Sequence, residues 1–308
     1  YTCRLMSKNK KDRRFLSIAT LNFVNVLGFT IFIPVLPFIV EDYGAPTWVY
    51  GLLLAAYPAA QFFGSPILGQ LSDRIGRKPV LMMSQLGTVL SWVVLAGSYF
   101  VGQIDGIAAV WPIGVLLLAR VVDGLTGGNV AVANAYLADI TTPQNRTNAY
   151  ARMGAFTGLA VIIGPAIGGF SSSTRFGYLG MAVVAFTISV VTLGMIWRFL
   201  IESNTHKVTA KRTQSRLSQV NVISQIRNLQ TRPGGRFMLM LSASFGVVMA
   251  GYTAIIVLFV IDRFGLSQAQ LSGFLLFVGM FLVFNQYIAV GKINRRFGDV
   301  NGFVIGLV

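Results

Sequence analysis

Charged residues are scarce in this chain, and acidic residues are the scarcest of them. Only 11% of the 308 residues are Asp, Glu, Lys or Arg, and just 10 residues are acidic. Soluble domains normally carry about 25% charged residues, so a water-soluble globular fold is excluded. Intrinsic disorder is excluded as well, because 54% of the residues are hydrophobic.

The chain also has only one cysteine and one histidine, Cys3 and His206. A single cysteine cannot form an intrachain disulfide, which excludes a disulfide scaffold. Zinc needs several His, Cys or carboxylate ligands at close spacing, and no second His, no Cys and no cluster of carboxylates lies near His206 in the sequence. Phosphate-binding loops and nucleophile motifs are missing too. We therefore expect no metal, no cofactor and no enzyme activity.

Long apolar runs are abundant instead. A spanning helix needs roughly 20 mostly apolar residues, and polar breaks separate the runs that meet this length. The predicted spans are residues 15–40, 48–71, 80–101, 112–138, 149–170, 177–200, 237–261 and 270–290. A ninth run begins near Val300, so we expect a fragment of a longer protein that does not transport on its own. The sequence predicts an all-α polytopic membrane protein.

The basic residues predict the orientation of these spans. Most of the 25 Lys and Arg residues fall in the amino-terminal tail and in every second loop. Because basic residues accumulate in cytoplasmic loops, we expect a cytoplasmic amino terminus in the plasma (inner) membrane. The net charge of +15 is then a topology signal, and no nucleic-acid partner is expected.

One long polar connection divides the chain into two parts. We expect an amino-terminal six-helix bundle at residues 1–200, a cytoplasmic basic linker at 201–235 and an incomplete carboxy-terminal bundle at 236–308. Apolar residues recur every three positions from Leu217 to Leu229. This spacing predicts either an amphipathic helix at the membrane surface or a solvated linker, and both interpretations stay open.

The two parts contain an internal repeat, with offsets of 221 and 222 residues. The matched positions are Glu41 with Asp262, Gly44 with Gly265, and residues 69–76 with residues 291–298. Two copies of a six-span unit are typical of transporters whose halves enclose a binding site near the middle of the membrane.

The loop after the second span carries a specific motif. It reads Gly69-Gln-Leu-Ser-Asp73-Arg74-Ile-Gly76-Arg77-Lys78, and it resembles the signature loop of the major facilitator superfamily. Gly76 permits a tight turn, and Asp73 can pair with the cations or face a helix amino terminus. The resemblance implies a gating loop. It also implies a major facilitator fold of two six-helix bundles, the second truncated, with about 8.5 of 12 helices present.

The fifth span resembles one group within this superfamily more specifically. Its run Gly164-Pro165-Ala-Ile-Gly168-Gly169 is similar to the antiporter motif of the 12-span drug/proton antiporters. Small residues let helices pack closely, and a proline can kink a helix. The chain as a whole is most similar to the tetracycline/proton antiporter branch. It departs from that branch at two positions, because Asn25 replaces an Asp and Leu282 replaces a coupling His.

The fourth span contains two charged residues, Arg120 and Asp123. Charges inside a membrane are costly and normally face a cavity or each other. Gly127 and Asn134 follow at helical spacing, so we expect all four residues on one face that lines the central cavity. We interpret Asp123 as the proton carrier and Arg120 as its partner. The alternative is a purely structural pair at positions i and i+3.

Polar side chains of other spans would complete a substrate site. The candidates are Asn25, Tyr57, Gln61, Asn134 and Gln286. Alternatively, these groups form hydrogen bonds between helices. The resemblance implies a monomeric transporter in the lipid bilayer that exchanges protons for small amphipathic drugs. Two other functions stay open, namely import of a sugar, organic acid or other nutrient, and a receptor or scaffold with a transporter fold.

Overall fold

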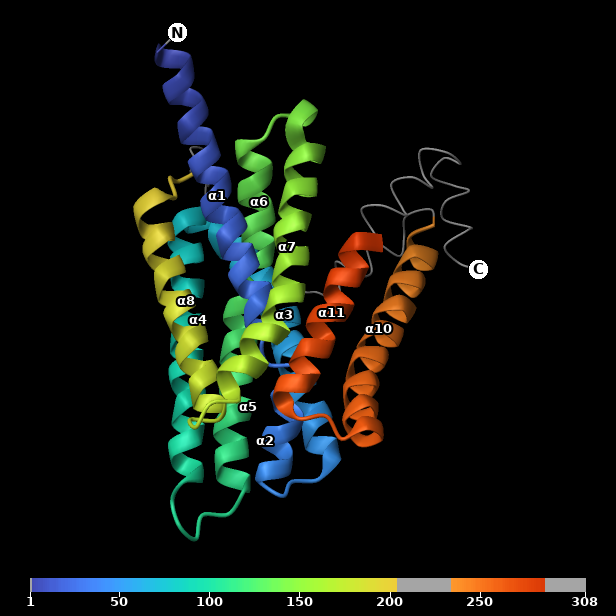
Figure 1. Ribbon diagram of the computed structural model, residues 1–308. Helices are drawn as coiled ribbons and strands as arrows, with labels where there is room; N and C mark the ends of the chain where they lie inside the picture. Colours follow the sequence, from blue (N-terminus) through green and yellow to red (C-terminus); the bar gives the residue numbers. More distant parts are fainter. Residues whose placement is uncertain (1, 204–233, 286–308) are drawn as a thin grey trace.

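Every element is an α-helix in the part of the chain that the computed structural model describes, residues 2–203 and 234–285 (Figure 1). The helices are α1 (Thr2–Thr30), α2 (Leu36–Asp42), α3 (Thr47–Ile75), α4 (Arg77–Gly102), α5 (Val110–Gly127), α6 (Val130–Ile140), α7 (Pro143–Ser172), α8 (Tyr178–Phe199), α10 (Gly235–Phe264) and α11 (Gln268–Asn285).

The eight predicted spans correspond to these helices, with α1 and α2 together forming the first span and α5 and α6 together forming the fourth. Six helical stretches of the described chain are long and apolar enough to cross a membrane, and two apolar stretches, Phe15–Thr30 and Gln268–Phe281, are shorter. Large apolar side chains such as Phe63 and Leu90 are exposed, as expected for surfaces that face lipid. The prediction of an all-α polytopic membrane protein is therefore confirmed. The ninth run, the pattern from Leu217 to Leu229 and His206 lie outside the described residues.

Proline explains the interruption of the first span. The turn between α1 and α2 contains Pro34, which cannot donate a backbone hydrogen bond. Pro37 follows in the first turn of α2, where its missing N–H group costs nothing. A second interruption, at Gly128 and Asn129 between α5 and α6, was not predicted from the sequence.

The bundle has two faces, each formed by helix ends (Figure 1). We call the one where α1 begins the amino-terminal face and the other the opposite face. The turns of the amino-terminal face are at residues 76, 141–142 and 200–203. The turns of the opposite face are at residues 43–46, 103–109, 173–177 and 265–267.

Helices α10 and α11 join the other helices mainly toward the opposite face. There α11 packs against α7, and Val257 and Val260 of α10 pack near Ile33. Toward the amino-terminal face α11 diverges from α7 in Figure 1. The repeat is visible in the backbone, because Gly44 and Gly265 both follow a helix end and both have a φ of 59°. Such a positive φ favours glycine.

Candidate functional site

The signature loop forms a tight turn at the amino-terminal face. Gly76 joins α3 to α4 with a φ of 107°, a backbone conformation that favours glycine. A Cβ atom at this position would also lie 2.6 Å from a carboxylate oxygen of Glu202. The backbone conformation therefore requires the glycine that the motif contains, and a larger residue would also displace the Glu202 carboxylate.

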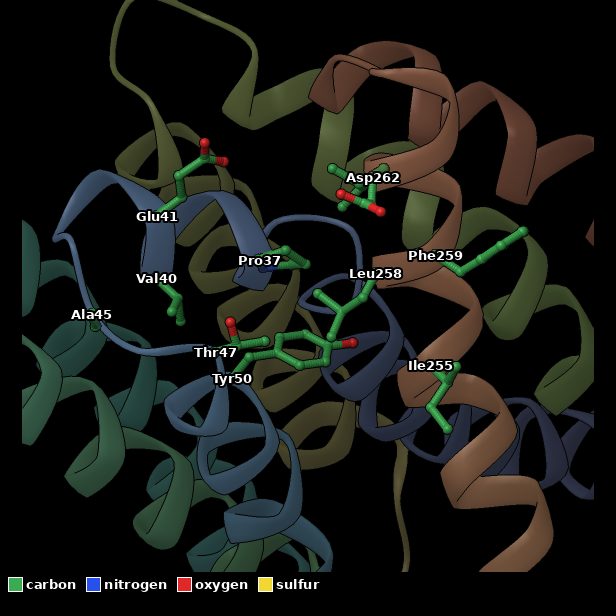
Figure 2. Close-up of a pocket in the computed structure, with 11 residues that line it drawn as sticks. Pro37, Val40, Glu41, Ala45, Thr47, Tyr50, Ile255, Leu258, Phe259 and Asp262 are labelled. Atoms are coloured by element: carbon green, nitrogen blue, oxygen red, sulfur yellow. The ribbon is translucent and has the colours of Figure 1, made fainter.

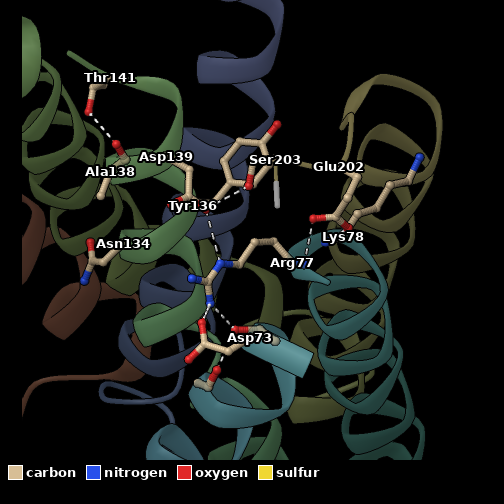
Figure 3. Close-up of polar contacts among 12 residues, drawn as sticks. Asp73, Arg77, Lys78, Asn134, Tyr136, Ala138, Asp139, Thr141, Glu202 and Ser203 are labelled. Carbon is tan, nitrogen blue, oxygen red and sulfur yellow. Dashed lines mark hydrogen bonds and ion pairs between the residues drawn. The ribbon is translucent and has the colours of Figure 1, made fainter. Parts of the chain in front are cut away.

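Arg77 holds the polar network around this turn (Figure 3). Its Nη1 atom lies 2.7 Å from Oδ1 of Asp73, and its Nε atom lies 3.3 Å from Oδ2 of Asp139. Nη1 also donates a hydrogen bond of 2.5 Å to the hydroxyl of Ser72. Arg77 thereby connects the end of α3 and the start of α4 with the end of α6. Of the two pairings expected for Asp73, the one with a cation of its own loop is formed.

Glu202 belongs to the same network and was missed in the sequence. Its carboxylate accepts hydrogen bonds from the backbone N–H groups of Arg77, at 2.9 Å, and Lys78, at 3.0 Å. These bonds cap the amino terminus of α4, where backbone donors have no partner within the helix. The hydroxyl of Ser203 donates to Oδ2 of Asp139 at 3.0 Å. The segment after α8 is therefore tied to the signature loop. The sequence offered one signal for this role, because Glu202 is an acidic residue just after the apolar span 177–200.

Replacing Glu202 by alanine should lower the free energy of unfolding by about 1 kcal/mol, because two N–H groups at the start of α4 lose their acceptor. Glu202→Gln keeps one acceptor oxygen and should lose less. Thermal unfolding of the purified protein measures both. Equal melting temperatures for wild type and Glu202→Ala would refute the proposed capping role.

Arg120 and Asp123 form a buried ion pair inside the bundle. The Nη2 atom of Arg120 lies 3.4 Å from Oδ2 of Asp123, and their side chains are 2% and 4% exposed. The hydroxyls of Thr88 and Ser91, on α4, lie close to the carboxylate. Two opposite charges far from water stabilise each other strongly, since each alone would be costly to bury.

Aromatic rings complete the surroundings of Arg120. Its guanidinium carbon lies 4.4 Å from the ring centre of Phe32 and 5.2 Å from that of Trp92. Such cation–π contacts are worth about 2 kcal/mol or more when desolvated. Within the described chain, Nε and Nη2 of Arg120 have no hydrogen-bond partner. The positive charge of Arg120 is therefore balanced by Asp123 and the aromatic faces.

The single helix face predicted for the fourth span is interrupted. Arg120 and Asp123, both on α5, are buried against α4 and the turn after α1. Asn134, on α6, is exposed. The break at Gly128 and Asn129 separates the two segments. Arg120, Asp123 and Gly127 are buried and Asn134 is exposed in the described part of the chain, and a common face that lines a central cavity stays a prediction.

Side chains from three helices form hydrogen bonds at this break, and two of them donate to backbone carbonyls. Gln61 donates to the carbonyl of Gly127 at 2.9 Å, and Ser84 donates to the carbonyl of Thr126. Asn25 donates to the side chain of Asn129 at 2.5 Å. A membrane interior offers no water to such groups, so partners on neighbouring helices are needed. Asn25 and Gln61 thus form interhelical hydrogen bonds, and a contact of either residue with substrate stays a prediction.

Tyr57 lies beside the same break. Its ring is 5.4 Å from that of Phe29, its hydroxyl accepts a hydrogen bond from Gln61 at 3.2 Å, and its side chain is buried. The remaining candidate, Gln286, lies outside the described residues.

The glycines of the fifth span mark two close helix contacts. A Cβ atom at Gly164 would overlap Thr30, and one at Gly168 would overlap the carbonyl of Ile31. On another side of α7, a Cβ atom at Gly169 would overlap Ser272 of α11. Pro165 lies within α7. This element therefore packs α7 against the end of α1 and against a helix of the second part of the chain.

Apolar spanning helices, a buried ion pair and repeat-related turns in the two parts of the chain together define a polytopic membrane transporter. The sequence profile of the Major Facilitator Superfamily matches residues 18–308. The chain belongs to this superfamily.

Its relatives include tetracycline resistance proteins of Escherichia coli. The class E protein is 30% identical over 303 residues, which cover 96% of this chain and 70% of the relative. The class C protein is 29% identical over 291 residues, covering 92% and 68%. The crystal structure of a bacterial homologue of the human lysosomal transporter Spinster is similar in fold, with a TM-score of 0.65 and 18% identity, covering 94% of this chain and 64% of that one. The protein is thus an integral membrane transporter of small molecules and not an enzyme.

Proposed function

We propose that the protein is a proton-coupled antiporter that exports small amphipathic drugs, including tetracycline-like compounds, by alternating access. Its similarity to tetracycline resistance proteins supports this substrate class. The sequence contains no phosphate-binding loop, so an ion gradient is the expected source of energy. The observation that carries the proposal is the buried pair of Arg120 and Asp123.

In this mechanism Asp123 carries the proton. Burial disfavours the charged form of a carboxylate, whereas the nearby Arg120 guanidinium favours it. A change in the separation of the two groups when substrate binds would release or take up a proton. The proposed substrate contacts are Asn25, Tyr57, Gln61, Asn134 and Gln286. Hydrogen bonds of Asn25 and Gln61 at the break that follows Asp123 in the chain support these two assignments.

The two parts of the chain move relative to each other during transport. We propose an amino-terminal bundle at residues 1–200, a linker at 201–235 and a second bundle that begins at 236. The contact of Gly169 with Ser272 then closes the opposite face, while the network of Asp73, Arg77 and Asp139 belongs to the gate at the amino-terminal face. We assign the amino-terminal face to the cytoplasm of a monomer in the inner membrane.

Transport of tetracycline into inverted membrane vesicles, driven by a pH gradient, tests the proposal with the full-length gene product. Asp123→Asn should abolish uptake, whereas Asp105→Asn, at an exposed acidic residue of the opposite face, should leave it unchanged. Binding of tetracycline to purified Asp123→Asn separates loss of coupling from loss of folding. Undiminished gradient-driven uptake by Asp123→Asn would remove Asp123 from the coupling role. Uptake only with the opposite gradient would assign an importer.

A further inference from the structure

A cavity of about 560 Å³ opens at the opposite face between α2, α3 and α10 (Figure 2). This volume lies within the range of small-molecule sites, about 300 to 1,000 Å³. Most of its wall is apolar, with side chains such as Val40, Leu258 and Phe259. None of the residues proposed for proton coupling or substrate contact lines this cavity.

Two carboxylates, those of Glu41 and Asp262, stand on its walls. Figure 2 shows them on different sides of the cavity, one on α2 and the other on α10. Each belongs to the last turn of its helix, where the helix dipole makes a negative charge unfavourable. Among the described residues, neither has an ion-pair partner. Arg263 lies beside Asp262 in the same turn of α10, but it forms no ion pair with either carboxylate among the described residues, so both can contact a cation in the cavity.

The repeat relates the two carboxylates. Glu41 precedes Gly44 by three residues, and Asp262 precedes Gly265 by three, with the same φ of 59° at both glycines. Equivalent turns of the two parts of the chain thus bring one carboxylate each to a common cavity.

Tyr50 provides an independent indication of a ligand. Its side chain is only 2% exposed, it lines the cavity, and within the described chain its hydroxyl has no hydrogen-bond partner. In Figure 2 this hydroxyl points from α3 toward α10. A buried hydroxyl without a partner costs about 1 to 3 kcal/mol, and a ligand with an N–H donor would reduce that cost by bonding to the hydroxyl oxygen.

We propose that this cavity binds an ammonium-type organic cation with an apolar body. Glu41 and Asp262 would neutralise the charge, the Tyr50 hydroxyl would accept a hydrogen bond, and the apolar wall would bury the body of the ligand. An inorganic cation fits less well, because magnesium and calcium take about six or more oxygen ligands. No group of three or more His, Cys or acidic side chains suited to a metal occurs in the described residues. The site is distinct from the proposed coupling site and does not depend on export.

Binding of fluorescent naphthylmethylammonium to the full-length gene product in lipid nanodiscs tests this assignment, with empty nanodiscs subtracted. Neutral naphthylmethanol is the matched probe. The double variant Glu41→Gln, Asp262→Asn should bind the ammonium about tenfold more weakly, because two partly exposed charge contacts are lost. Tyr50→Phe keeps the ring and should weaken the ammonium about threefold, through one lost hydrogen bond. Asp105→Asn, an exposed acidic residue at the same face, is the control.

Unchanged binding of naphthylmethanol to the double variant, together with the selective loss of ammonium binding, would support the site. Equal ammonium affinity in wild type and the double variant would overturn it, as would an equal loss in Asp105→Asn. Displacement of the probe by magnesium alone, at concentrations similar to that of the probe, would contradict the assignment of an organic cation as the ligand. Matching melting temperatures establish that each variant is folded.

Discussion

Replacing Asp123 by alanine should destabilise the protein by about 3 to 5 kcal/mol, because Arg120 would keep a buried charge without its partner. The side chain of Arg120 is only 2% exposed, and the Phe32 and Trp92 rings cannot replace a full negative charge. Thermal unfolding in detergent, compared with wild type, measures the loss.

A second variant separates stability from coupling. Removing both charges, as in Arg120→Met with Asp123→Leu, should restore most of the lost stability, because a well-packed apolar pair often costs little relative to a buried ion pair. Transport driven by a pH gradient should remain absent in this double variant. Full stability of Asp123→Ala would contradict the structural account of the pair, and transport by the double variant would contradict its role in coupling.

Replacing Gly168 by valine should destabilise the contact between α7 and α1 by about 3 kcal/mol, the upper end of the usual cost of overpacking. The added Cβ atom would overlap the carbonyl of Ile31, and backbone atoms cannot move aside as a flexible side chain can. Both the melting temperature and transport should therefore fall.

Gly158→Val is the matched control, since it lies on the same helix and its Cβ atom would meet no atom within 4 Å. Its free energy of unfolding should stay within about 0.5 kcal/mol of the wild-type value, as for other substitutions away from packed contacts. Equal behaviour of the two variants would mean that α7 and α1 do not pack as closely as the structure indicates.

The fold could be predicted largely from the sequence, because the length and polarity of a spanning helix are local properties. Hydropathy located the apolar runs of spanning length. The break at Gly128 and Asn129 escaped because the whole run from 112 to 138 is apolar. Its stability depends on Gln61, Ser84 and Asn25 from three other helices, and no local pattern reveals such partners.

The polar network around Gly76 was predicted only in part, because a local pattern reveals only residues that are close together in the chain. The signature motif named Gly76 and Arg77 because they are adjacent in the chain. Glu202 is more than 120 residues away from them, and its hydrogen bonds to the start of α4 arise only when α8 packs beside α4. The repeat gave Glu41 and Asp262 as a matched pair, but the shared cavity requires the two parts of the chain to meet.

Asp123 is central to this account, and proton release on substrate binding tests it most directly. The measurement adds tetracycline to the purified full-length gene product in weakly buffered solution with a pH indicator, and corrects for the protonation of tetracycline itself. At a pH where Asp123 is protonated before binding, wild type should release about one proton for each tetracycline bound, because binding of the two ligands is coupled, and Asp123→Asn should bind tetracycline without release. Equal proton release from Asp123→Asn and wild type would contradict the proposal that this buried carboxylate carries the proton.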